Sequence, residues 1–497
     1  MCGIVGYTGN RQAAPVLLKG LSRLEYRGYD SAGLAIRNGS EKVEVVKAKG
    51  RLKNLSDKTD NGNAIKGTCG IGHTRWATHG EPSVTNAHPH VSGNCTGSGC
   101  GTVESEVTGV HNGIIENYKE LKEKLLRHGY RFYSETDTEV VIKLVDYYYK
   151  KYQMGPVDAI AKTMVRVRGS YALELMFQDY PDEIFLARKD SPMIIGCNET
   201  ETFIASDVPA ILKYTRNVYY IGNLEMARIK AGEVHFFNLD GDEIQKETTE
   251  IKWDAEAAEK AGFEHFMMKE IHEQPKAVRD TLSSLVKEDC IDLTSAGLTD
   301  EVLSSVEMIY IVACGSAWHV GKQSQYIIED LAKVPVRVEL ASEFRYRKMP
   351  LMKNSLVIVV SQSGETADTL AALRLAKEMG IPVLGLVNVV GSSIAREADY
   401  VLYTLAGPEI SVATTKAYSA QLVAMDVFAI RLAQVKGQMD AETCAYYLAS
   451  LSALPDQMER ILEDKDRIQW FASNMRMPMM FSLLAEAWIM RFLWKAV

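Results

Sequence analysis

The first seven residues constrain this chain more than any other stretch. Cys2 follows the initiator methionine directly and leads into the apolar run Gly3–Tyr7. If Met1 is removed, Cys2 carries both a thiol and a free α-amine. An amine with a pKa of about 7.7–8 can accept the proton of a thiol with a pKa of about 8.5, which makes the residue a self-contained nucleophile. The alternative is that Cys2 is a small apolar residue that starts a buried strand.

Length and charge narrow the possible classes of protein. With 497 residues, the chain is long enough for two to four domains, each with its own core. Its 56 basic and 64 acidic residues give a net charge of −8 without a basic block, which argues against a nucleic-acid or membrane surface. The eight cysteines are scattered without paired metal spacing, and no signal peptide pattern precedes them. We therefore expect a cytoplasmic protein without a bound metal.

The first half, up to about residue 240, consists of short β-rich runs broken by Gly, Asn and Asp, which is typical of a mixed α+β domain. The pattern predicts helices near Ala13–Leu24, Tyr118–His128 and Thr138–Tyr152. It predicts strands at Gly33–Arg37, Val43–Lys47, Gly70–Thr74, Ala172–Phe177, Glu183–Arg188 and Thr202–Ala205.

Three polar clusters in this half suit amide chemistry. His73–Gly80 offers the guanidinium of Arg75, which can bind a carboxylate through two hydrogen bonds. Val110–Gly113 offers the side-chain amide of Asn112 and a glycine N–H, the two donors that an oxyanion hole requires. Glu135–Glu139 opens a helix, where Asp137 could cap the helix or contact a ligand ammonium. Taken singly, the clusters could equally be a surface salt bridge, a turn and a helix cap.

Together with Cys2 and the stretch Leu24–Gly33, these clusters resemble the class II glutamine amidotransferases, which have an N-terminal nucleophile. The resemblance covers residues 2–240 and implies that Cys2 attacks the side-chain amide of glutamine while its own α-amine carries the proton. It also implies roles for the other residues: Arg75 and Asp137 hold the α-carboxylate and α-amine of glutamine, Thr78 and His79 line the pocket, Asn112 and Gly113 stabilise the oxyanion, and Trp76 gates an ammonia channel.

One segment departs from that family. Residues 91–108 form a longer and more Gly/Ser-rich stretch than we expect before His111. Its Cys95 and Cys100 could bind a metal or form a disulfide, but we expect a flexible surface insertion. Such an insertion would alter a lid over glutamine and leave the chemistry unchanged.

The second half has a different pattern. Residues 241–285 are charged and helical, which predicts a linker between domains, and residues 286–436 alternate apolar strands with helices, as in a parallel, doubly wound sheet. Two strands end in turns rich in Ser, Gly and Thr, at Gly315–His319 and Ser361–Thr366. Such turns present hydroxyls and backbone N–H groups to an anion at a helix N-terminus. The alternative is that these residues only cap two helices.

These turns resemble the sugar isomerase (SIS) domain, which binds phosphosugars. The resemblance implies that the phosphosugar contacts Ser316, Ser361, Gln362, Ser363, Thr366 and Val412, while Ala317 stands where some relatives have serine. The two halves together resemble the enzymes that transfer the amide nitrogen of L-glutamine to D-fructose 6-phosphate, giving D-glucosamine 6-phosphate and L-glutamate. This implies no cofactor, and a homodimer formed through the SIS domains.

The C-terminal part does not follow this pattern. Residues 437–474 look like the start of a second SIS unit, whereas residues 475–497 match nothing expected. We hypothesise that a single-base deletion near Ser473–Met475 shifted the reading frame, so that the second SIS unit is incomplete. The isomerase lysine and glutamate of the family would then be missing and the synthase half impaired. Two alternatives stay open: a chain that only hydrolyses glutamine, and a phosphosugar-responsive binding protein.

Overall fold

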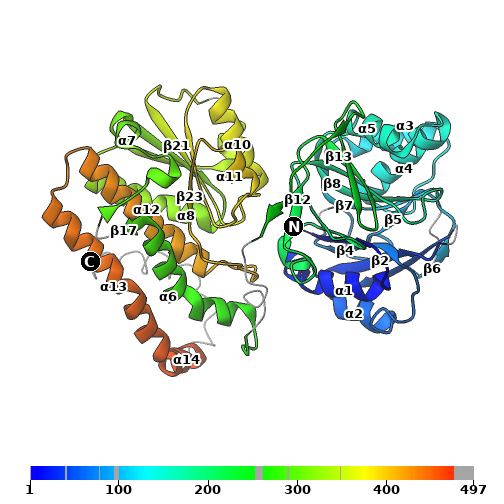
Figure 1. Cartoon of the computed structure of the whole chain (residues 1–497), viewed down its shortest axis with the longest axis horizontal. Helices are drawn as coiled ribbons and strands as arrows, with labels where there is room; N and C mark the ends of the chain where they lie inside the picture. Colours follow the sequence, from blue (N-terminus) through cyan, green and yellow to red (C-terminus); the bar gives the residue numbers. More distant parts are fainter. Residues whose placement is uncertain are drawn as a thin grey trace. The chain divides into compact units, whose positions relative to one another are not determined.

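The computed structural model describes residues 2–39, 42–77, 79–93, 100–251, 261–287, 290–347 and 349–474. The expectations for Thr78, for Cys95 and for residues 475–497 lie outside these ranges. The chain divides into two compact units, residues 1–255 and 256–497 (Figure 1). Among the described helices, none is both long and apolar enough to cross a membrane.

The described part of the first unit contains two large sheets, which are mainly antiparallel. The first sheet has the strand order β16 (Thr249–Glu250), β12 (Asn217–Tyr220), β10 (Ile194–Cys197), β11 (Thr202–Ala205), β1 (Gly3–Thr8), β4 (Cys69–Arg75), β2 (Ser31–Arg37), β3 (Val43–Lys49) and β6 (Cys100–Val103). The second has the order β15 (Glu243–Ile244), β14 (Glu233–Phe237), β13 (Glu225–Lys230), β9 (Ile184–Lys189), β8 (Gly169–Phe177), β7 (Val107–Ile115) and β5 (His90–Val91).

Helices cover the outer faces of both sheets. Helices α1 (Ala13–Ser22) and α2 (Leu52–Lys58) pack on the first sheet, and α4 (Asp137–Lys151) packs on the second with α3 (Tyr118–Arg127) and α5 (Pro156–Met164) beside it (Figure 1). Side chains alternate along each strand, so Ile4 enters the core between the sheets while Val5 enters the core beneath α1. The unit therefore has four layers, with helices on both sides of a sandwich.

The second unit is built around a five-stranded parallel sheet in its described residues. Its order is β20 (Val336–Leu340), β19 (Met308–Ala313), β21 (Ser355–Ser361), β22 (Val383–Val387) and β23 (Tyr400–Tyr403). The other described elements are α6 (Phe266–Leu285), β17 (Val286–Lys287), β18 (Cys290–Ile291), the short helix η4 (Thr294–Ala296), α7 (Asp300–Ser305), α8 (Ser316–Leu331), α9 (Ala341–Phe344), α10 (Ala367–Glu378), α11 (Ser393–Glu397), α12 (Lys416–Val435), α13 (Ala441–Glu463) and α14 (Lys465–Asn474).

Both faces of this sheet are covered, as the continuous apolar strands predict. Ile309 and Ile311 pack into the core that contains α6, α8, α12 and α13, while Tyr310 and Val312 pack towards α9, α10 and α11. The strand order reverses between β19 and β21, and the carboxyl ends of such strands are where doubly wound folds bind ligands. The expected fold of an α+β unit followed by a doubly wound α/β unit is therefore confirmed.

Two expectations concern connecting segments. Of the predicted flexible insertion, residues 91–108, the part 94–99 lies outside the described ranges, and the described part contains β6, in which Val103 pairs with Val43 of β3. The second expectation needs correction. The predicted linker, residues 241–285, is divided between the units. Its strands β15 and β16 join the sheets of the first unit, and α6 packs against α12 and α13 in the second. Apolar residues at helical spacing in α6, such as Val278 and Leu282, explain why this helix belongs to a core.

Candidate active site

Strand pairing places Cys2 beside Trp76. Cys2 directly precedes β1, and Gly3 pairs with Thr74 of β4, so the residues that flank this pair also lie close together. The backbone N–H of Trp76 donates to the Cys2 sulfur across 3.2 Å, and the sulfur lies 3.5 Å from the Trp76 carbonyl oxygen. Cys2 is half-buried at the end of the central strand of the first sheet.

The surroundings of the Cys2 thiol favour its protonated form. Burial raises the pKa of this thiol, and the charge of Asp137 raises it further. The N–H of Trp76 and the positive charge of Arg75 act in the opposite direction. A base close to the sulfur is therefore needed to produce the thiolate at neutral pH.

The inter-sheet face of the sandwich brings the polar residues together. Ile71 belongs to the core between the sheets, so His73 and Arg75, two and four residues further along β4, share its face. On β7, Val110 belongs to the same core, and Asn112 follows it on that face. The apolar core therefore ends in a polar cluster at one end of the sandwich.

Asn112 is joined directly to the residue that carries the nucleophile. Its side-chain Nδ2 donates to the carbonyl oxygen of Cys2 across 2.9 Å, and the side chain is buried. The next residue, Gly113, has φ of 136°, and a Cβ atom there would lie 2.0 Å from the carbonyl oxygen of Ser170. Only glycine fits this backbone conformation and close approach.

Arg75 is held rigidly by the loop that follows it. Its guanidinium donates to the carbonyl oxygens of His79, of Gly80 at 3.1 Å and of Glu81 at 3.4 Å. Burial lowers the pKa of Arg75, while the nearby acidic groups of Cys2 and Asp137 act to raise it. Arg75 is thus a fixed, buried cation beside the nucleophile.

Asp137 occupies the first position of α4 and does not cap it, which corrects one of the two expected roles. The N-cap is Thr136, whose side-chain oxygen accepts from the N–H of Glu139 across 3.3 Å. The Asp137 carboxylate instead accepts from the N–H of Ile115 across 2.9 Å and from that of Thr138 across 3.1 Å. These bonds hold a buried carboxylate at the edge of the cluster.

His79 and Trp76 lie at the margin of the cluster. The ring of His79 contacts Tyr118 edge-on, with centroids 5.3 Å apart. Trp76 is 39% exposed, and its ring packs against Tyr29 at 5.4 Å. Its expected role as a channel gate stays a prediction.

Two contributing residues were not given a role from the sequence. Asp30 lies in the Leu24–Gly33 stretch, and its carboxylate accepts from the N–H of Ala77 across 2.9 Å, which anchors the start of the loop after β4. His73 contacts Asn112, as described below. The alternation along β4, which puts His73 on the face of Arg75, is the sequence signal that could have identified His73.

The second unit gathers the predicted phosphosugar residues at one edge of its sheet. Ser316 opens α8 directly after β19, and Ser361 ends the neighbouring strand β21. The turn after β21 is ordered by its own hydroxyls. Ser361 Oγ lies 2.9 Å from Thr366 Oγ1 and accepts from the N–H of Gly364 across 3.1 Å. Ser363 Oγ accepts from the N–H of Glu365 across 3.2 Å.

Asn388 ties this turn to the next loop. Its backbone N–H donates to the carbonyl oxygen of Gln362 across 3.1 Å. Its side-chain oxygen accepts from Thr404 Oγ1 at 3.1 Å and from the N–H of Ala406 at 2.8 Å, and its Nδ2 donates to the carbonyl oxygen of Gly407 at 2.7 Å. Asn388 thus joins two of the predicted ligand loops, one through its backbone N–H and the other through its buried side chain.

Val412 lies in the second of these loops and is 67% exposed. The carboxylate of Glu270, on α6, accepts from the N–H of Ile410 across 2.5 Å and from both the N–H and the hydroxyl of Ser411. The helix predicted to be a linker therefore orders the loop that carries Val412.

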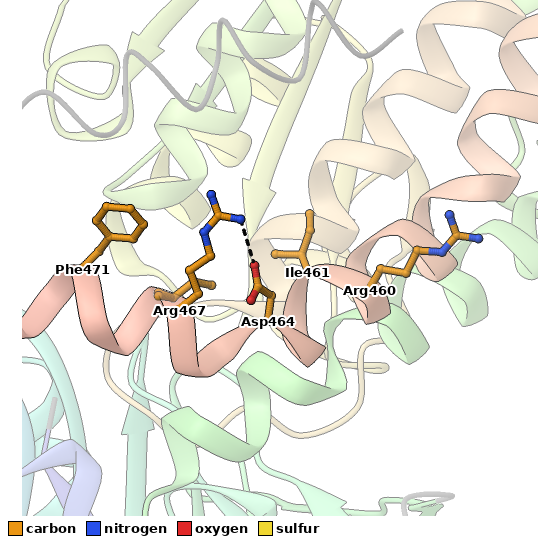
Figure 2. Close-up of a pocket in the computed structure, with 6 residues that line it drawn as sticks. Arg460, Ile461, Asp464, Arg467 and Phe471 are labelled. Atoms are coloured by element: carbon orange, nitrogen blue, oxygen red, sulfur yellow. Dashed lines mark ion pairs between the residues drawn. The ribbon is translucent and has the colours of Figure 1, made fainter.

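A hollow of about 400 Å³ lies elsewhere, where α13 meets α14. Figure 2 shows Ile461 and Phe471 along this hollow, with Arg467 and Asp464 forming an ion pair of 3.6 Å. It contains no nucleophile and none of the predicted site residues, so we do not place a reaction there. Across the described ranges, no three His, Cys, Asp or Glu side chains are grouped so that they could hold a metal ion.

Comparison with known proteins gives two domain matches. Residues 101–213 match a glutamine amidotransferase domain, and residues 302–431 match an SIS domain. Two curated relatives carry the name glutamine–fructose-6-phosphate aminotransferase (isomerizing). The one from Caldanaerobacter subterraneus subsp. tengcongensis is 53% identical over 476 residues, and the one from Clostridium acetobutylicum is 51% identical over 475 residues. Each alignment covers 95% of this chain and 76% of the relative.

Among solved structures, the C-terminal domain of glucosamine-fructose-6-phosphate aminotransferase from Francisella tularensis is 39% identical. The match covers 43% of this chain and 60% of that one, with a TM-score of 0.42.

Proposed function

This chain belongs to the glutamine–fructose-6-phosphate aminotransferase (isomerizing) family, and we propose that it transfers the amide nitrogen of L-glutamine to D-fructose 6-phosphate. The products are D-glucosamine 6-phosphate and L-glutamate. The observation that carries the proposal is the cluster at the end of the sandwich. There Asn112 is hydrogen-bonded to Cys2, and the charges of Arg75 and Asp137 act on the Cys2 thiol.

The first half of the reaction follows from the position of Cys2. Once Met1 is removed, the α-amine of Cys2 takes the thiol proton and the sulfur attacks the side-chain carbonyl carbon of glutamine. A carbon–sulfur bond forms, and the carbonyl oxygen becomes an oxyanion. Collapse of this intermediate breaks the carbon–nitrogen bond, and the amine returns its proton to the leaving ammonia. Water then hydrolyses the thioester to glutamate.

We assign Asn112 and Gly113 to stabilisation of the oxyanion. The Nδ2 of Asn112 has two hydrogens, of which one is used on the Cys2 carbonyl oxygen and the second remains for the intermediate. Such donors act most strongly where water is excluded, and the loss of one typically costs about 2.7–4 kcal/mol of barrier.

Arg75 and Asp137 suit the two charged groups of the glutamine backbone. A buried guanidinium fixed by backbone carbonyls can bind the α-carboxylate, and a buried carboxylate can bind the α-ammonium. We assign His79 to the pocket wall because its carbonyl oxygen holds Arg75. The same family pattern assigns Thr78 to the pocket.

For the second half of the reaction we propose that fructose 6-phosphate binds at the edge formed by β19 and β21. Hydroxyls and helix N-termini can hold a phosphate without a basic side chain. The contacting residues would be Ser316, Ser361, Gln362, Ser363, Thr366 and Val412. The support for this site is its position at the reversal of strand order and the ordering of its loops by Asn388 and Glu270.

We further propose that the chain acts in the cytoplasm as a homodimer formed through its SIS unit. The support for the dimer is membership of the family. The support for the cytoplasm is that both substrates are ordinary metabolites of the cell interior. Sedimentation equilibrium of the full chain tests the dimer.

The decisive experiment supplies glutamine labelled with heavy nitrogen in its side-chain amide, together with fructose 6-phosphate. Mass spectrometry should find the label in glucosamine 6-phosphate and unlabelled glutamate as the second product. Glutamate without labelled amino sugar would reduce the proposal to hydrolysis of glutamine. If neither product forms, the proposed function is wrong.

A further inference from the structure

His73 contacts the side chain that contacts Cys2. It lies on β4 and is completely buried. Its ring Nε2 is 3.1 Å from Asn112 Oδ1 and 3.2 Å from the carbonyl oxygen of His111. Asn112 in turn donates from Nδ2 to the Cys2 carbonyl oxygen across 2.9 Å. A continuous chain of hydrogen bonds therefore runs from His73 through Asn112 to the residue that carries the nucleophile.

The partners of His73 determine where its proton lies. A backbone carbonyl oxygen can only accept, so Nε2 must carry the hydrogen that faces His111. Burial, together with the charge of Arg75, lowers the pKa of His73 to about 3, so the ring is neutral at physiological pH. A neutral imidazole carries one hydrogen, which leaves Nδ1 without one.

This tautomer determines the orientation of Asn112. The one hydrogen on Nε2 is shared between two acceptors, the His111 carbonyl oxygen and the side-chain oxygen of Asn112, so that oxygen faces His73 and the NH₂ group faces Cys2. The flipped amide would set NH₂ against the N–H of His73 and an oxygen against the Cys2 carbonyl. Both contacts would then be repulsive.

We propose that His73 is a positioning residue, which holds the amide of Asn112 with its donor face towards the carbon that Cys2 attacks. This inference rests on the proposed function, because the oriented NH₂ group matters only if an oxyanion forms beside Cys2. His73 touches neither glutamine nor the sulfur in this account. It acts only through Asn112.

The remaining contacts of His73 are those of a packed ring. Its ring packs against that of His88 with centroids 4.0 Å apart and the ring planes tilted by 36°, and its Nδ1 has no hydrogen-bond partner in the described structure. Nε2 is therefore the atom whose loss should change the chemistry. Glutamine can place an amide N–H near the position of Nε2, whereas asparagine is one bond shorter and leucine has no donor.

The test measures glutamine hydrolysis by the full chain carrying His73→Leu, His73→Asn or His73→Gln, with Asn112→Ala and the double variant His73→Leu/Asn112→Ala. Removing an oxyanion donor outright costs roughly 10²–10³ in kcat. We expect His73→Leu and His73→Asn to lower kcat by at least about tenfold, but by no more than the outright loss of the donor does. KM for glutamine should change little, and His73→Gln should recover most of the activity.

A matched control removes the imidazole that packs against His73. His88→Leu should lower the melting temperature in the way that His73→Leu does, yet leave kcat close to that of the unaltered chain. This control separates an effect on Asn112 from a general loss of packing.

The double variant provides the sharpest comparison. If His73 acts through Asn112, adding His73→Leu to Asn112→Ala lowers kcat no further. Full additivity of the two losses would overturn the inference, as would an unchanged kcat in His73→Leu. If the leucine variant does not fold, His73→Asn and His73→Gln are compared instead. A higher kcat in His73→Gln supports the inference, and equal kcat values for the two variants would overturn the inference. An unaltered chain that does not hydrolyse glutamine would count against the proposed function instead.

Discussion

The backbone N–H of Trp76 points at the sulfur of Cys2 from 3.2 Å, and the two residues are neighbours because β1 pairs with β4. An N–H donor stabilises a thiolate, which opposes the effect of burial on the pKa of this thiol. The donor comes from the backbone, so its position is set by the register of two central strands. A one-residue slip would reverse the faces on which the side chains lie.

The α-amine of Cys2 is the base in this account, so a blocked N-terminus should abolish hydrolysis. We expect a chain that retains residues ahead of Cys2 to release no glutamate, although its fold is unchanged. Mass spectrometry of the N-terminal peptide establishes which form is present, and circular dichroism verifies the fold. Hydrolysis at the normal rate by a chain with an extended N-terminus would show that another group acts as the base.

Asn388 should control binding of the phosphosugar without affecting glutamine. The change Asn388→Asp keeps the shape of the side chain but replaces the donor that binds the Gly407 carbonyl oxygen with a carboxylate oxygen. A buried acceptor set against another acceptor costs about 1–3 kcal/mol, so we expect the Kd for fructose 6-phosphate to rise about tenfold.

Calorimetric titration measures this binding, and glutamine hydrolysis without sugar serves as the second readout. The exposed residue Asn354 gives the matched control, since Asn354→Asp adds the same charge to the same unit. An equal loss of affinity in both variants would show that charge, and not the two loops, is responsible.

Glu174 lies in the middle of the core between the sheets and should destabilise the fold at neutral and alkaline pH. It is completely buried on β8, neither carboxylate oxygen has a partner in the described structure, and a Cβ atom on Gly6 would lie 2.9 Å from Oε2. Burial raises its pKa well above the usual value. The folded chain therefore holds the Glu174 proton more tightly than the unfolded chain does. The resulting contribution to the free energy of unfolding is complete below the ordinary pKa of 4.5 and is lost as pH rises through the raised pKa of the folded state.

The variant Glu174→Leu should therefore raise the melting temperature, by more at pH 8 than at pH 5. Glu183→Gln is the matched contrast, because that carboxylate is paired with Arg228 at 2.5 Å and with Lys230 at 3.1 Å and its loss should lower the melting temperature. A melting temperature of Glu174→Leu that lies below that of the unaltered chain at pH 8 would contradict this argument.

The buried histidines predict sensitivity to acid. Burial lowers the pKa of His73 to about 3 and that of His88 well below its ordinary value, and the two rings pack against each other. Below about pH 6.5 these histidines are protonated in the unfolded chain but stay neutral in the folded chain. The free energy of unfolding should therefore fall as pH decreases below about 6.5. Thermal melts between about pH 7 and 5 should show this fall, and His88→Leu should make it shallower. A slope unaffected by His88→Leu would assign the acid sensitivity to other groups.

Much of the fold could be predicted from the sequence because it follows from local patterns of apolar and turn-forming residues. The apolar runs before the turns Gly315–His319 and Ser361–Thr366 predict two strands, which the structure has at Met308–Ala313 and Ser355–Ser361. Parallel strands end at the same edge of a sheet, so the sequence alone predicts that the Ser-rich turns after them lie together. The amidotransferase clusters were likewise recognisable as motifs.

Features that depend on distant contacts were harder to predict. His73 acquires its role from a contact with Asn112, 39 positions further along the chain and on the other sheet. The helix α6 looked like a linker because it is charged, yet its apolar side packs into the second unit. Thr136 and Asp137 are both good caps, and only the tertiary bond to Ile115 decides that Asp137 points elsewhere.

The most direct test of the account asks which atom glutamine acylates. A glutamine analogue with an electrophilic group at the side-chain carbonyl should label the full chain once, and peptide mass spectrometry should place the adduct on Cys2. Cys2→Ala should remain unlabelled and produce no glutamate. Labelling of a different cysteine, such as Cys314, or continued glutamate production by Cys2→Ala, would contradict the central claim that Cys2 is the nucleophile.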